Sequence, residues 1–82
     1  MQYTNFGNFI RNKRKKLGKA LNAFAIECGV DKASISNFER GISSVYFDNF
    51  VKIAYGFGTT PSALLTEFEK EDYIVKSQWN KR

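Results

Sequence analysis

The side chains best suited to binding another molecule lie in one stretch near the middle of the sequence. Read with a helical period, one face of this stretch carries hydrogen-bond donors and short side chains without an acid: Lys32, Ala33, Ser34, Asn37 and Arg40. Ile35 and Phe38 fall on the opposite, apolar face. Donors and small groups on the outside of a helix suit a groove in DNA, where base edges present acceptors and methyl groups.

The sequence offers little for catalysis or metal binding. It has no His and one Cys, which argues against most metal sites and against any disulfide within the chain. No nucleophile has a partner at usable spacing, and the acidic run 67–72 is typical of a solvated surface. Cys28 falls on an apolar helix face and is expected to be a buried, inert thiol. We therefore expect no enzyme and no cofactor, metal or small-molecule ligand.

The elements around the polar face predict a helix-turn-helix. Residues 21–28 form a first helix, and Gly29 interrupts its pattern at a tight turn. Asp31 can cap a second helix from Lys32 to about residue 40, and Gly41 ends it. Two short helices joined by such a turn are the helix-turn-helix arrangement.

This stretch resembles the helix-turn-helix of phage Cro/repressor-type (xenobiotic-response-element-like) regulators. The matching residues are Ala25, Gly29, Val30, Ser34, Ile35, Ser36 and the run Phe38-Glu39-Arg40-Gly41. The similarity extends from about Phe6 to Leu65. It implies an all-α fold, a compact five-helix lambda-repressor-like domain over residues 4–66. Residues 67–82 are then a short C-terminal extension that either dimerises or is a flexible tail.

The other helices follow from their apolar periods. In the first helix of the chain, Thr4 or Asn5 is expected to cap the N-terminus and Gly18 to end the helix. Arg14 lies on the apolar stripe of this helix. That stripe is Phe6, Phe9, Ile10 and Leu17, and the broad apolar face of the fourth helix is Phe47, Phe50, Val51, Ile53, Ala54 and Phe57. Thr60 caps a fifth helix with Pro61 at its first position, and Leu64, Leu65 and Phe68 continue its stripe.

The start of the helix at 21–28 departs from the family pattern. Ala20 and Leu21 stand where the family usually has Ser or Thr followed by Gln. Ala is a poor cap, so Asn22 could cap a helix shortened by one turn with Leu21 tucked inward. A side-chain contact to DNA from this helix start is therefore not expected.

The charge is concentrated in one half of the chain. Residues 1–40 carry eight Lys or Arg against three acids, whereas residues 41–82 carry five of each sign. A one-sided basic field favours a polyanionic partner. The 82 residues suit one domain, and no apolar run is long enough to span a bilayer. Without a recognisable signal peptide, we expect a soluble cytoplasmic protein associated with the nucleoid.

The resemblance assigns roles to single residues. Lys32, Ala33 and Asn37 occupy the family's base-reading positions. The expected phosphate contacts are Ser34, Ser36, Arg40, Ser43, Ser44 and Arg11, although Ser34 and Ser36 could also cap locally. Glu39 is expected to form a structural ion pair with Arg14 rather than to face DNA.

These features predict a sequence-specific DNA-binding transcriptional regulator, a repressor that binds double-stranded DNA at a palindromic operator as a homodimer. The expected dimer interface is the apolar set Leu65, Phe68, Ile74, Val75 and Trp79. The alternative is a protein-interaction module, such as an antitoxin, that binds a partner protein. Salt-dependent binding to duplex DNA would distinguish the two, because only a DNA reader displaces phosphate counterions.

Overall fold

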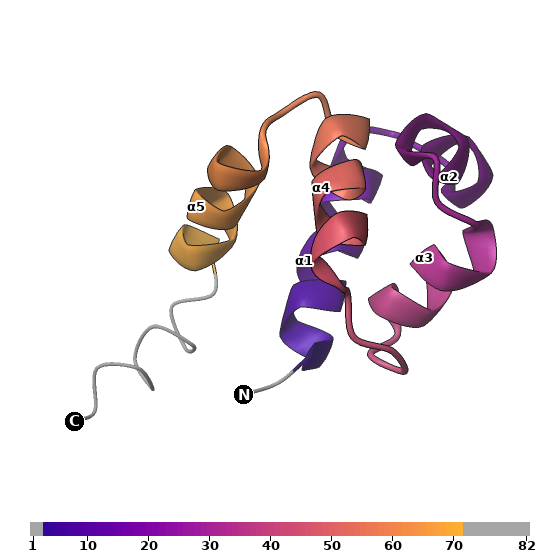
Figure 1. The fold of residues 1–82 in the computed structure, drawn as a ribbon, viewed down its shortest axis with the longest axis horizontal. Coiled ribbons are helices and arrows are strands. Elements are labelled where there is room, and N and C mark those ends of the chain that lie inside the picture. Colours follow the sequence, from indigo (N-terminus) through magenta and orange to yellow (C-terminus); the bar gives the residue numbers. More distant parts are fainter. Residues whose placement is uncertain (1–2, 72–82) are drawn as a thin grey trace.

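The computed structural model describes residues 3–71 (Figure 1). Over that range the protein consists of five helices and has no strand: α1 (Tyr3–Lys16), α2 (Leu21–Cys28), α3 (Lys32–Glu39), α4 (Phe47–Gly56) and α5 (Pro61–Glu71). This agrees with the all-α, five-helix fold expected from the sequence. Helix α1 packs against α3 and α5, α2 packs against α3 and α4, and α4 also packs against α5.

The core lies between the helices and combines aliphatic with aromatic side chains. Its buried apolar members are Phe9, Ile10, Phe24, Ala25, Cys28, Val30, Ile35, Phe38, Ile53, Ala54 and Leu64. Phe24 of α2 lies 4.5 Å, centroid to centroid, from Phe57 at the end of α4. Aromatic rings bury much area each, which a domain of this size needs in order to be stable.

A close helix crossing sets where α1 meets α3. Gly7 is buried in α1, and a Cβ added to it would collide with the backbone carbonyl oxygen of Phe38. The absence of a side chain therefore lets α1 approach the end of α3 directly. This contact holds the helix that carries the polar face against the rest of the domain.

Helix α5 continues past residue 66, which is the domain boundary expected from the sequence. Phe68 packs edge-on against Phe6 of α1, with 5.0 Å between ring centroids. Lys13 of α1 also forms an ion pair of 2.9 Å with Glu67. Residues 67–71 are thus a helical part of the packed domain, and residues 72–82 lie outside the described residues.

Several expectations about helix ends and stripes were wrong. Helix α1 already includes Thr4 and Asn5, so neither precedes it as a cap. Leu17 follows the end of α1 and is 51% exposed, and Phe47 is 75% exposed at the first position of α4. A helical stripe shows which residues share a face, but no neighbouring helix covers the stripe at these two ends.

Candidate nucleic-acid interface

The corner between α2 and α3 is closed by local backbone bonds. Gly29 has a φ of 71°, the left-handed conformation that glycine adopts without a Cβ clash. Its N–H donates to the carbonyl of Ala25 at 2.9 Å, and the N–H of Val30 donates to the same carbonyl at 3.1 Å. These bonds give a backbone carbonyl at the end of α2 its hydrogen-bond partners, and they fix the direction in which α3 starts.

Asp31 caps α3, as the sequence predicted. Its Oδ2 accepts from the backbone N–H of Ser34 at 3.3 Å and from the Ser34 hydroxyl at 3.0 Å. The Ser34 hydroxyl is therefore engaged within the cap. This is the local role that the sequence left open beside a phosphate contact.

The residues expected to read bases line a single hollow at the start of α2 and along α3. The hollow has a volume of about 460 Å³ and is lined by Leu21, Asp31, Lys32, Ala33, Ser36, Asn37 and Arg40. Lys32 and Ala33 are exposed, and Asn37 is half-buried. The structure thus gathers all three expected base-reading residues around one space and adds Leu21 and Asp31, which sequence reasoning did not include.

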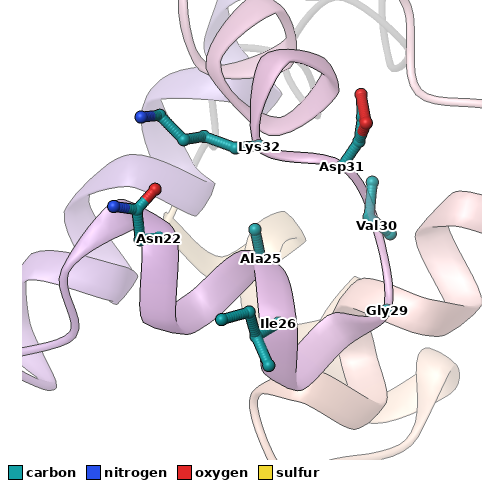
Figure 2. Close-up of a pocket in the computed structure, with 7 residues that line it drawn as sticks. All are labelled: Asn22, Ala25, Ile26, Gly29, Val30, Asp31 and Lys32. Carbon is teal, nitrogen blue, oxygen red and sulfur yellow. The ribbon is translucent and has the colours of Figure 1, made fainter.

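A second hollow of about 470 Å³ lies beside the first, between α2 and the start of α3. In Figure 2 the Lys32 ammonium group and the Asn22 amide extend to one side of it, whereas the Asp31 carboxylate points elsewhere. Ile26 is 81% exposed here, whereas Phe24, Ala25 and Cys28 of the same helix are buried. The helical period agrees with this exposure, because Ile26 lies two residues from both Phe24 and Cys28 and so falls on the opposite side of α2.

Two residues of the polar face are bonded to each other. Arg40 Nη2 donates to Asn37 Oδ1 at 3.1 Å. From the sequence, Arg40 is expected to contact phosphate and Asn37 to contact a base. Their spacing of three residues on a helix is the signal that could have predicted the contact.

The expected ion pair between α1 and α3 is present. Arg14 Nε and Nη2 donate to the Glu39 carboxylate oxygens at 2.8 and 2.9 Å, and both residues are buried. Arg14 Nη1 also donates to the backbone carbonyl of Lys19, at 2.9 Å. The bond with Glu39 raises the pKa of the Arg14 guanidinium above its ordinary value, although burial acts in the opposite direction. The acid on α3 is therefore directed into the domain.

The remaining expected phosphate contacts surround α3. Arg11 is exposed on α1, Ser36 is half-buried on α3, and Ser43 and Ser44 follow α3 in the loop toward α4. The N–H groups of Ile42 and Ser43 donate to the backbone carbonyl of Asn37, at 2.9 and 3.4 Å. These bonds fold the loop back over the end of α3.

The start of α2 lacks a side-chain cap. Ala20 occupies the cap position without a cap hydrogen bond, as expected, and Leu21 is half-buried against the core. Asn22 lies inside the helix, so the alternative in which it caps a shortened helix is wrong. The N–H groups at this end therefore receive no side-chain cap.

The expected dimer residues fall into three groups. Leu65 is 46% exposed on α5, whereas Phe68 is partly buried against the core of its own domain. Ile74, Val75 and Trp79 lie outside the described residues. Of the five, Leu65 is the residue that the structure places in solvent.

A family model described as helix-turn-helix matches residues 10–64. The chain belongs to this helix-turn-helix family. Its geometry and family membership make it a DNA-binding transcriptional regulator of the Cro/repressor type and not an enzyme, and they do not favour the alternative of a protein-interaction module.

Two relatives are control proteins of similar length. The regulator is 36% identical to control protein C.MunI of a Mycoplasma species over 67 residues, which cover 80% of this chain and 90% of that one. It is 36% identical to control protein C.BamHI of Bacillus amyloliquefaciens over 61 residues, covering 73% of this chain and 75% of the other.

Solved structures show the same helical arrangement. An HTH_3 family transcriptional regulator from Vibrio cholerae has a TM-score of 0.75 and 36% identity, over 88% of this chain but 38% of that chain. The restriction-modification controller protein C.AhdI from Aeromonas hydrophila has a TM-score of 0.69 and 27% identity, over 73% of this chain and 91% of its own.

None of the helices in the described part of the chain is both long and apolar enough to cross a membrane. Within residues 3–71 no group of three or more Cys, Asp or Glu side chains is placed to hold a metal ion.

Proposed function

We propose that this regulator acts as a homodimer that binds a palindromic operator and represses the promoter overlapping it. The observation that carries the proposal is the hollow along α3, where Lys32, Ala33 and Asn37 lie together. A single short recognition helix contacts few base pairs, and dimers of this class read half-sites about one helical turn apart. The protein would act in the cytoplasm, on DNA of the nucleoid.

The base contacts follow from side-chain chemistry. Lys32 can donate to guanine O6 and N7, and Asn37 can bond a purine edge. The Ala33 methyl group can contact the methyl group of thymine. The three residues share one hollow, which supports their acting on neighbouring base pairs.

The phosphate contacts would flank this region. Arg11 on α1 and Ser44 in the loop are exposed, and the backbone N–H groups at the start of α2 have no side-chain cap. Uncapped N–H groups at a helix N-terminus are a ready site for a phosphate oxygen. These contacts would give affinity without sequence preference and would orient α3 in the groove.

The similarity to two control proteins and to a restriction-modification controller favours a role in such a system. We infer that the operator lies upstream of restriction-modification genes. Mapping the bound sites on the DNA that flanks this regulator's own gene tests that inference separately from the binding mode.

The binding mode is tested by selecting bound sites from random duplexes and measuring variants against every single-base change of the best site. Lys32→Ala and Asn37→Ala should each lose about 1–3 kcal/mol on that site and relax preference at one or two base pairs per half-site. Asn12→Ala, an exposed change on α1 outside the hollow, is the matched control. Equal loss across the whole panel for both variants would contradict base reading.

A further inference from the structure

The hydrogen bond between Arg40 and Asn37 fixes which end of the Asn37 amide faces outward. A guanidinium group has five N–H donors and no acceptor, so the amide atom that it faces must be the oxygen. The Asn37 Oδ1 accepts from Arg40 Nη2 at 3.1 Å. The amide nitrogen therefore faces away from Arg40, and within residues 3–71 neither of its hydrogens is used in a side-chain bond.

Asn37 is bonded through its backbone carbonyl to the loop after α3, and its side chain shares a hollow with Arg40. Its side chain is half-buried, and its backbone carbonyl accepts from the N–H groups of Ile42 and Ser43. Asn37 and Arg40 line the same hollow of about 460 Å³. A base edge that reaches Asn37 in this hollow therefore also lies beside the positive charge of Arg40.

We propose that Arg40 is a positioning residue for base reading: it holds Asn37 as a hydrogen-bond donor, and the pair favours guanine over adenine at the base pair that Asn37 meets. This inference rests on the proposed function of the hollow. It differs from the role expected from the sequence, in which Arg40 contacts phosphate alone.

The preference follows from the two purine edges. To bond adenine at two points, an Asn oxygen must accept from the N6 amino group while its nitrogen donates to N7. In the Arg40–Asn37 pair, the Asn37 oxygen already accepts from the Arg40 guanidinium. The positive charge of that guanidinium also repels the adenine amino group. Guanine presents two acceptors, O6 and N7, to the major groove. The free amide N–H groups and the remaining Arg40 donors match that edge.

The test uses the full chain and the best selected operator. The base pair that Asn37 meets is identified as the one at which Asn37→Ala loses preference. At that base pair the parent should favour guanine, and Arg40→Ala should reduce the guanine-to-adenine affinity ratio by roughly tenfold or more. Arg11→Ala removes a charge from exposed α1 instead, so it should weaken binding without changing this ratio.

Two outcomes would overturn the inference while leaving the proposed function intact. One is that Arg40→Ala weakens binding equally for all four base pairs, because Arg40 is then a phosphate contact only. The other is that Arg40→Ala still changes the ratio in an Asn37→Ala background, because Arg40 then reads the base directly. A parent protein with no base preference at any position would instead refute the proposed function itself.

Discussion

Arg14 of α1 and Glu39 of α3 meet at two points, with 2.8 Å between Nε and Oε2 and 2.9 Å between Nη2 and Oε1. Their side chains are only 10% and 5% exposed. A buried carboxylate and guanidinium that satisfy each other in this way hold two helices in one fixed relation.

Glu39→Gln should therefore destabilise the domain strongly. The substitution leaves the Arg14 charge buried and without its carboxylate, which costs about 3–5 kcal/mol in the free energy of unfolding. Chemical denaturation followed by circular dichroism measures the loss. Glu27→Gln is the control, since it breaks the partly exposed 2.9 Å pair with Lys19 and should cost about 0–1 kcal/mol. Similar losses for the two variants would contradict this prediction.

Gly7→Ala should also destabilise the fold, although alanine is the better helix former. The new methyl group would collide with the Phe38 carbonyl oxygen, a backbone atom that cannot rotate away. We expect a loss of about 1–3 kcal/mol from overpacking. Asn8→Ala, at the exposed neighbouring position, should be neutral or slightly stabilising. An equal or higher melting temperature for Gly7→Ala than for the parent would show that α1 and α3 can separate at little cost.

Leu65→Arg should convert the proposed homodimer to a monomer without unfolding it. Leu65 is 46% exposed, so the change places no charge in the core but does place one in the proposed interface. Light scattering at several concentrations reports the mass, and Ile26→Arg on α2 is the matched control. Shortening the chain to residue 66 would be a poor test, because it also removes Phe68 from its packing against Phe6. Ending the chain at Glu71 tests the later residues separately. An unchanged mass for Leu65→Arg would exclude Leu65 from the interface.

Cys28 should make stability fall in alkaline solution. Burial raises the pKa of its thiol from an ordinary value of 9.0 to about 11, and the nearby Glu27 acts in the same direction. The folded protein then keeps a proton that the unfolded chain loses, so stability is constant below about pH 9 and declines between pH 9 and 11. The full effect is roughly 2–3 kcal/mol.

The measurement compares denaturation of the parent and Cys28→Ala between pH 7 and 11. Because high pH affects the protein in other ways too, the informative quantity is the difference between the two stability profiles. The parent should lose more stability than the variant across that window. Parallel profiles would show that the thiol titrates in the folded protein as it does in the unfolded chain.

The sequence predicted the local features of the site well. Gly29 forms the turn between α2 and α3, and Asp31 caps α3. Both act through bonds to residues no more than four positions away, so their residue types alone were enough to predict these two features. The exposure of Leu17 and Phe47 could not be predicted, because it depends on where distant helices end. The bond between Arg14 and the Lys19 carbonyl could not be predicted either, because every residue has a backbone carbonyl and its residue type does not show which one accepts a bond.

Arg14 contacts both Glu39 of α3 and the backbone just before α2, so one side chain ties both helices of the helix-turn-helix to α1. If α3 reads bases as proposed, these bonds would resist its tilting to follow a groove of unsuitable width. In a complex of the proposed dimer, the adjustment must then come from the duplex, whose resistance to bending and twisting depends on its sequence. The stiffness of the base pairs between the half-sites, which neither subunit would touch, would thereby become part of what the proposed dimer recognises.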